Sequence, residues 1–207
     1  DMDSNFYVNN RGARGAPTSR TLQNAKAFDL FGEGRLFVTD EIALVAGANW
    51  GQAKRDYRSF AVPGAGSTFN LEAGKTYDWI SPRIGLLWQN ETGSQVFANL
   101  TRSVEPPNFG SMSPTNTGFA PVRSQKAWTG EVGARGHRGP FTYDVTLYRA
   151  ELKGEMLQYT VNPSIPASTF NADETLHQGI EAALDWAVAP HWRVRQTWTY
   201  SDFRFRD

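Results

Sequence analysis

The sequence predicts an all-β fold, an antiparallel transmembrane β-barrel with about eight strands in these 207 residues. Eight stretches alternate apolar and polar residues, which puts the two sets on opposite faces of a sheet. The connectors between the stretches alternate between tight turns and long polar loops, as the two rims of a membrane barrel do. On the apolar face, bulky aromatics stand beside the tight turns, where a membrane interface would place them.

The alternating stretches define the expected strands and the connectors between them. In chain order, the expected strands are 25–38, 42–58, 76–89, 94–104, 127–137, 141–159, 175–187 and 191–205. The tight turns are 39–41, 90–93, 138–140 and 188–190, and the long loops are 59–75, 105–126 and 160–174. The long loops are rich in Gly, Pro, Ser, Thr and Asn, which are common loop residues.

Each expected strand is supported by apolar residues at every second position, which we assign to an outward, lipid-facing side. In strand order, these residues are Phe28, Leu30, Leu36, Val38; Ile42, Leu44, Ala46, Ala48, Trp50; Ile84, Leu86, Trp88; Val96, Ala98, Leu100; Trp128, Val132, Ala134; Phe141, Tyr143, Val145, Leu147; Ile180, Ala182, Leu184, Trp186; and Trp192, Val194, Trp198, Tyr200. Four of the bulky aromatics, Trp88, Phe141, Trp186 and Trp192, lie beside tight turns.

The opposite faces hold polar residues that we expect to point inward. A dry protein core could not accommodate so many charges. The inward residues include Asp29, Glu33, Arg35, Asn49, Arg83, Asn99, Thr101, Glu131, Arg135, Asp144, Glu181, Asp185, Arg193 and Arg195.

Composition excludes several classes of protein. The 21 basic and 21 acidic residues give no net charge, so no nucleic-acid partner is indicated. The longest apolar run, about 42–48, is far shorter than the roughly 20 residues of a transmembrane helix. A mean hydropathy of −0.50 remains compatible with a barrel, because only every second residue of a crossing is apolar. Cysteine is absent, which excludes disulfides and thiolate metal sites, and the polar start at Asp1 indicates a mature or internal piece.

Two alternative folds remain open from the residues alone. A soluble β-sandwich binding module would also alternate, although strands of 12 or more residues are long for a globular sheet. A small, self-contained eight-stranded outer-membrane barrel with a structural, adhesive or enzymatic role would suit the length. The long loop 105–126 and an unpaired leader over residues 1–24 count against such closure.

Several motifs, in this order and spacing, resemble the barrel of TonB-dependent outer-membrane receptors of the siderophore type. The resemblance covers about Tyr77 to Phe205. Its motifs are SPRIGLLW at 81–88, VFANLTRSVEPPNFG at 96–110, EVGARG at 131–136, LYRAELKGE at 147–155 and HQGIE at 177–181.

The resemblance implies a barrel of 22 strands in the outer membrane of a Gram-negative bacterium, filled by an N-terminal plug. Residues 25–207 would then form a partial receptor barrel, and residues 1–24 an extracellular loop or leader segment. The implied partners are a ferric siderophore or related large ligand, outer-membrane lipid, and the TonB complex, reached through a plug that is absent from these residues. No cofactor and no enzymatic activity are implied.

The candidate ligand-binding residues lie at the long-loop ends of the strands. Arginines pair with anionic carboxylate or catecholate oxygens, and aromatics cover flat ligand surfaces. Loop packing, or contact with lipopolysaccharide, is the competing interpretation for each of them. The candidates are Arg102, Asn108, Phe109, Phe119, Arg123 and Tyr159.

Enzyme and metal sites are not supported by the spacing. Glu181 and Asp185 share a face but lie roughly 13 Å apart along a strand, too far for a paired glycosidase site. The three histidines, His137, His177 and His191, are expected near different strand ends and not at one site.

Overall fold

The computed structural model describes residues 1–62, 70–112, 114–115, 118–119, 122–160 and 168–206. Nine strands form one antiparallel sheet in the order β1-β2-β3-β4-β5-β8-β9-β10-β11, and β6 and β7 form a separate pair. Among the described residues, no helix is long and apolar enough to cross a membrane. The strands are β1 Met2–Asn10, β2 Ala13–Phe37, β3 Ile42–Phe60, β4 Leu71–Gln89, β5 Gln95–Glu105, β6 Pro114–Thr115, β7 Gly118–Phe119, β8 Gln125–Arg138, β9 Phe141–Tyr159, β10 Ser168–Ala189 and β11 Trp192–Arg206.

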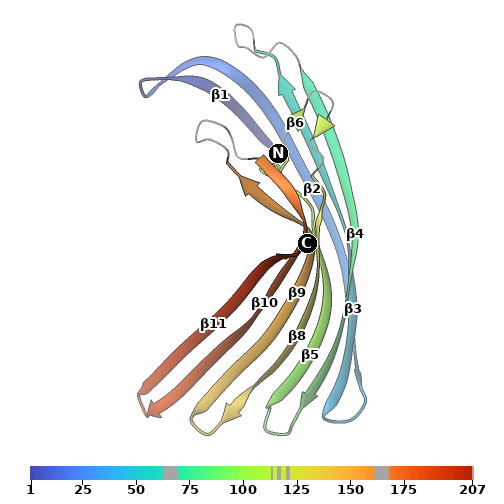
Figure 1. Ribbon diagram of the computed structural model, residues 1–207, viewed down its shortest axis with the longest axis vertical. Helices are drawn as coiled ribbons and strands as arrows, with labels where there is room; N and C mark the ends of the chain where they lie inside the picture. Colours follow the sequence, from blue (N-terminus) through green and yellow to red (C-terminus); the bar gives the residue numbers. More distant parts are fainter. Residues whose placement is uncertain (63–69, 113, 116–117, 120–121, 161–167, 207) are drawn as a thin grey trace.

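The nine strands make a curved wall that is open along one side (Figure 1). The tight turns that join β2 to β3, β4 to β5, β8 to β9 and β10 to β11 all lie at one end, drawn at the bottom, and the strand ends that the longer connections join lie at the other. The strands β1 and β11 stand at the two edges of the sheet, which does not close on itself. The predicted all-β wall with two unlike rims is therefore confirmed, and the small closed barrel is not what the structure shows.

Strand register confirms the predicted division between an apolar and a polar face. Directly paired residues in an antiparallel sheet share a face. One such row of neighbours across five strands consists entirely of apolar or aromatic residues, Ala98, Val132, Leu147, Ile180 and Tyr200.

Nothing in the described chain covers this apolar face. Leu147 is 50% exposed, Val132 48% and Trp128 47%, although a core would bury side chains of this size. A β-sandwich would place a second sheet over these residues. The sandwich interpretation is therefore wrong, and we call this exposed surface the outer face.

The apolar residues of the outer face form a band that has the same length in β3 and in β4. It runs over nine residues from Ile42 to Trp50 in β3, and over nine from Ile80 to Trp88 in β4. A transmembrane β-strand needs about 9–11 residues when tilted. Aromatics mark both limits of the band, with Trp50, Trp128 and Tyr200 at the upper one and Trp88, Phe141 and Trp186 at the lower one.

The structure corrects the expectation for residues 1–24. Met2–Asn10 pairs with the first part of β2, so this segment is a hairpin continuous with the sheet and not an unpaired leader. An ion pair between Arg20 and Asp3, 2.7 Å long, joins its two strands. The main sheet consequently has nine strands where eight were expected.

Several strands also extend further toward the upper rim than predicted. β4 begins at Leu71 instead of 76, and β10 begins at Ser168 instead of 175. Above the apolar band, outward positions are polar, as at Glu72 and Glu174, so apolar alternation disappears while the hydrogen-bonded ladder continues. Alternation therefore records the membrane-spanning part of a strand and not its whole length.

The buried residues lie mostly on the inner face, near the upper rim. Ala53, Ala73 and Tyr77 on the wall are covered where Met112 and Val122 of the β5–β8 connection are also buried. The connection passes the point where the β4–β5 ladder stops at Arg83 and Thr101. The next residue of β4 is Pro82, which has no N–H to donate to a further rung.

Gly133 of β8 offers a test of packing on the inner face. A Cβ added there would meet the ring of Phe97 and the backbone oxygen of Val145, the latter at 2.7 Å. We expect Gly133→Ala to lower the free energy of unfolding by about 1–3 kcal/mol, because neither neighbour can move freely. The control is Gly130→Ala in the same strand, where a Cβ meets nothing within 4 Å. Heat-modified gel mobility of the folded protein measures the difference, and equal stability of the two variants would contradict this packing.

Candidate functional site

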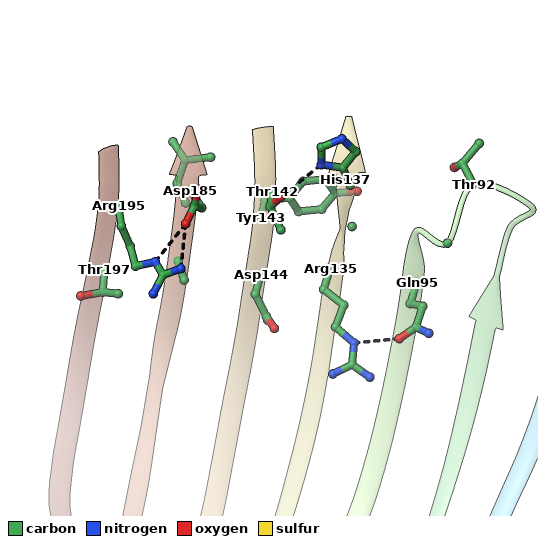
Figure 2. A pocket seen from close by; sticks show the side chains of 14 residues that line it. Thr92, Gln95, Arg135, His137, Thr142, Tyr143, Asp144, Asp185, Arg195 and Thr197 are labelled. Atoms are coloured by element: carbon green, nitrogen blue, oxygen red, sulfur yellow. Dashed lines mark hydrogen bonds and ion pairs between the residues drawn. The ribbon is translucent and has the colours of Figure 1, made fainter. Parts of the chain in front are cut away.

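The lower part of the inner face is a hydrophilic wall around a hollow of about 780 Å³. Residues of β5, β8, β9, β10 and β11 line it. Figure 2 shows two of the contacts there, Arg195 with Asp185 at 2.8 Å and Arg135 with Gln95 at 2.7 Å. Arg193 also pairs with Asp185, at 3.3 Å, so that carboxylate is shared by two guanidinium groups and is only 18% exposed. These contacts pair the charged groups with neighbouring side chains of the wall.

The charges in this wall were predicted to point inward, and the structure confirms that. Further up the same face, Arg83 pairs with Glu33 at 3.0 Å, and Asn49 donates a hydrogen bond to Asp29 at 3.2 Å. Neutralised pairs of this kind make a water-compatible surface without a reactive centre. Among the described residues, no group of three or more His, Asp and Glu side chains is arranged to hold a metal ion.

The described parts of the β5–β8 connection, between residues 106 and 124, lie against the upper part of the inner face. The hydroxyl of Tyr77 lies 3.8 Å from the sulfur of Met112, and Lys75 donates a hydrogen bond to the carbonyl of Val122 at 3.3 Å. Burial raises the pKa of Tyr77 above its ordinary value. The described parts of the connection therefore rest on the wall and do not extend away from it.

Asn171 of β10 fastens the end of this connection at Arg123. Its side-chain oxygen accepts a hydrogen bond from the N–H of Arg123 at 2.8 Å, and its amide donates to the carbonyls of Arg123 at 3.0 Å and Gly154 at 2.8 Å. One side chain thus satisfies backbone groups of two separate segments. This clamp holds the backbone of Arg123 and uses none of its side-chain atoms.

A second hollow, of about 710 Å³, lies beside the clamp between the upper halves of β4 and β8. Lys75, Tyr77 and Arg123 line it together with Asp173. Arg123 is 71% exposed and only loosely paired with Asp173, at 3.9 Å. Its guanidinium is therefore available to an anionic group at little desolvation cost.

Arg102 does not join this group. It pairs in register with Trp128, which places it on the outer face, and its guanidinium donates to the carbonyl of Ile80 where the β4–β5 ladder has ended. Ile80 still pairs with Trp50 of β3, and this contact gives its carbonyl a partner where the pairing with β5 has ended. The position and the contact favour a structural role for Arg102 over ligand binding.

The other candidates lie at three places. Phe109 borders a hollow with Tyr57 and Met112, so it belongs to the inward-folded connection. Asn108 accepts a hydrogen bond from the N–H of Ser111 at 2.9 Å and shapes the turn before it. Tyr159 lies at the tip of β9 and contacts Phe170 edge-on, with ring centroids 5.6 Å apart. Phe119 is part of β7, but its side chain lies outside the described residues.

A polar cluster on β9 to β11 was not predicted. Thr175 donates a hydrogen bond to Glu155 at 2.5 Å, the His177 ring nitrogen lies 3.3 Å from the same carboxylate, and the His177 ring stacks on Phe203 with centroids 4.2 Å apart. Strict alternation from Lys153 would put Glu155 on the outer face. Gly154 has a φ of 68°, and this backbone conformation precedes the change of side.

The chain matches the family model described as TonB dependent receptor-like, beta-barrel, over residues 1–207. No curated protein sequence is significantly similar to it.

Solved structures with the same fold cover most of the chain. The copper transporter OprC matches 91% of it with a TM-score of 0.72 and 13% identity. The ferric-catecholate import receptor Fiu from Escherichia coli K12 matches 93% with a TM-score of 0.70 and 19% identity, and the ferric yersiniabactin uptake receptor FyuA from Yersinia pestis matches 91% with a TM-score of 0.68 and 17% identity. The chain spans 30%, 30% and 29% of those three structures, respectively.

We expect Asn171→Ala to release the end of the β5–β8 connection. Loss of its three hydrogen bonds lowers the free energy of local opening by about 1.4 kcal/mol or more, a factor of about ten. Limited trypsin digestion of the folded protein reports this directly, since cleavage after Arg123 leaves a fragment that begins at Ser124. The control is Asn70→Ala, which removes a single hydrogen bond to Ala61 in a different connection. A cleavage rate at Arg123 equal to that of the unaltered protein would show that the clamp does not hold this segment.

Proposed function

Because this chain belongs to the TonB-dependent receptor β-barrel family, we propose that it is part of the barrel wall of a receptor that imports a ferric siderophore or a similar large chelate. Members of the family are outer-membrane transport receptors and not enzymes. The observation that supports the proposal best is the division of one sheet into an uncovered apolar outer band and a hydrophilic inner wall. A wall with lipid on one side and water or protein on the other needs one apolar face and one hydrophilic face.

We propose that more strands complete the barrel by pairing with the open edges of the sheet. Unpaired N–H and C=O groups along β11, and along β2 below Gln23 where β1 has ended, are costly in hydrocarbon, so open sheet edges do not occur there. The chain covers about 30% of the structures that it matches, and further strands would pair with both edges. We propose that the complete receptor also contains a plug against the inner wall, and that the TonB complex acts on this plug.

The proposed ligand site is the upper mouth of the inner face. Two of the similar structures are described as importers of ferric chelates, a ferric-catecholate and ferric yersiniabactin. Such a ligand presents anionic oxygens and flat rings, which suit Lys75, Arg123, Tyr77 and Phe109. Asn108, Phe119 and Tyr159 remain proposed contacts from the same rim.

The proposed site is tested by Arg123→Ala in the complete receptor. We expect about tenfold weaker binding of the ferric chelate, since one charge-assisted hydrogen bond contributes roughly 1.5 kcal/mol or more. Equilibrium titration with a panel of iron-loaded siderophores, followed by uptake in cells that depend on the receptor, measures the effect. The matched control is Arg58→Ala, an arginine of the outer face that pairs with Glu72 at 2.8 Å. Unchanged affinity for every ferric chelate would remove Arg123 from the binding site.

The proposal also predicts what the coding sequence contains upstream of Asp1. A plug domain of well over a hundred residues should be encoded there in the same reading frame. Sequencing that region is the measurement. The absence of any such domain would contradict the proposed transport cycle, because no other part would receive the action of the TonB complex.

A further inference from the structure

Glu155 of β9 places a carboxylate among largely buried neighbours near the upper rim. Its side chain is 18% exposed, and Thr175 beside it is 4% exposed. A carboxylate in such surroundings is costly unless polar groups bond to it. The hydroxyl of Thr175 donates a hydrogen bond to it at 2.5 Å, and a ring nitrogen of His177 lies 3.3 Å away. These two contacts with β10 hold the Glu155 side chain in one place.

The backbone at Gly154 turns Glu155 toward these partners. The β8–β9 ladder ends at Lys126 and Lys153, and the next residue of β9, Gly154, has a φ of 68°. Residues with a Cβ are disfavoured in this left-handed region. A Cβ added to Gly154 would meet no atom closer than 3.6 Å, so the backbone conformation, and not a lack of space, favours glycine here.

The peptide unit between Gly154 and Glu155 connects the carboxylate to Asn171. That unit is planar, and its oxygen is the Gly154 carbonyl that accepts a hydrogen bond from the Asn171 side chain at 2.8 Å. Because the Glu155 side chain is held, the orientation of this carbonyl is held as well. The other two hydrogen bonds of the Asn171 amide go to the backbone N–H and carbonyl of Arg123, at 2.8 Å and 3.0 Å.

The three hydrogen bonds of Asn171 are geometrically linked, because its amide group is planar. The N–H donors of the amide point in fixed directions, toward the carbonyls of Gly154 and Arg123. If the Gly154 carbonyl rotates away, the amide can turn, and both of its bonds to Arg123 weaken. The backbone position of Arg123 thus depends on Glu155 through Gly154 and Asn171.

Arg123 lies where the strand ladder does not hold its backbone. The β5–β8 ladder begins only at Glu105 and Gln125, two residues further along β8. The Arg123 side chain is 71% exposed and lines the hollow of about 710 Å³, which Gly154 also lines. Holding the backbone before a ligand arrives lowers the entropy that binding costs. Support from Glu155 would therefore show as tighter binding by Arg123.

We propose that Glu155 is a positioning residue for the proposed ligand site, acting through Gly154 and Asn171 to preorganise Arg123 for an anionic oxygen of the ligand. This inference rests on the proposed function, which makes Arg123 a contact of the ferric chelate. Glu155 itself contacts no ligand, since its carboxylate is occupied by Thr175 and His177. Its effect should therefore disappear when an intermediate of the route is removed.

Trypsin cleavage after Arg123 in the complete, folded receptor tests the positioning directly. Glu155→Leu removes the acceptor of both contacts and should raise the cleavage rate at least about threefold. Glu155→Gln keeps an acceptor oxygen and should restore most of the protection. The matched control is Glu151→Leu in the same strand, which removes a carboxylate paired with Arg149 and Arg206 on the outer face and should leave the rate unchanged.

A backbone variant tests the same route without changing a charge. Gly154→Ala puts a side chain at a left-handed position and should also raise the cleavage rate at least about threefold. Its matched control is Gly139→Ala, because Gly139 has a φ of 59° and open space around it but lies in a turn at the lower rim. If Glu155→Leu does not refold, as judged by heat-modified gel mobility, the two glycine variants decide. Equal cleavage for the two leucine variants, or for the two alanine variants, would overturn the inference.

A double variant tests whether the effect passes through Asn171. With Asn171→Ala in place, Glu155→Leu should no longer change the cleavage rate, because the group that carries its effect is gone. A further increase in that background would show that Glu155 stabilises the rim by another route, and the positioning role would be wrong.

Titration with the panel of iron-loaded siderophores distinguishes failure of this inference from failure of the proposed function. We expect Glu155→Leu to weaken chelate binding at least about threefold in the parent receptor and not at all in Arg123→Ala. An equal loss in both backgrounds overturns the inference alone. A parent receptor that binds no ferric chelate overturns the proposed function, whereas the cleavage rates still decide whether Glu155 positions Arg123.

Discussion

Hydrocarbon offers no hydrogen-bond partner to a peptide group, so strands that cross a bilayer must satisfy their backbones within the sheet. The ladders of this wall meet that requirement across the apolar band. β9 and β10, for example, pair from Phe141 and Trp186 at the lower rim to Tyr159 and Ser168 at the upper one. Once neighbouring strands are hydrogen-bonded in this way, side chains have only two directions available. The division into one lipid face and one hydrophilic face follows from that geometry.

The requirement relaxes above the band, and the structure changes there accordingly. The β4–β5 ladder ends beside Pro82, and in the described part of the β5–β8 connection Met112 and Val122 are buried against the inner face. Arg102 satisfies one carbonyl at this break, and Asn171 satisfies backbone groups at another. Near water, side chains thus satisfy some of the backbone groups, whereas in the membrane the ladder alone satisfies them. The proposed ligand site lies in this upper region.

Most of the membrane-spanning wall could be predicted from the sequence, because a period of two is visible wherever one face is apolar. The strand 141–159 was predicted with its observed limits, and the inward positions of Arg135 and Asp185 were also correct. The prediction failed where outward residues become polar. Residues 1–24 look like a loop by alternation, yet Met2–Asn10 and the start of β2 are paired strands.

The candidate site was less accessible to sequence reasoning, since it depends on how a long connection folds. Arg102 was chosen for its charge and its place near a strand end, but its register puts it beside Trp128 on the outer face. Arg102 lies two positions after the outward-facing Leu100, so alternation alone already predicted an outward side chain. Glu155 could not have been placed by parity, because the left-handed backbone at Gly154 interrupts the alternation. Contacts such as that of Asn171 with Arg123 join residues 48 positions apart and have no local pattern.

The central claim is that the apolar face of this wall meets lipid. The chain has no cysteine, so single cysteines introduced at successive positions from 192 to 201 of β11 can be spin-labelled without interference from its other residues. In membranes that contain the complete receptor, collisions with oxygen and with a water-soluble nickel chelate should alternate with a period of two. Oxygen should reach 194, 198 and 200, and the chelate should reach 195, 197 and 199. Labels at the apolar positions that are shielded from both reagents would show that protein, not lipid, covers this face.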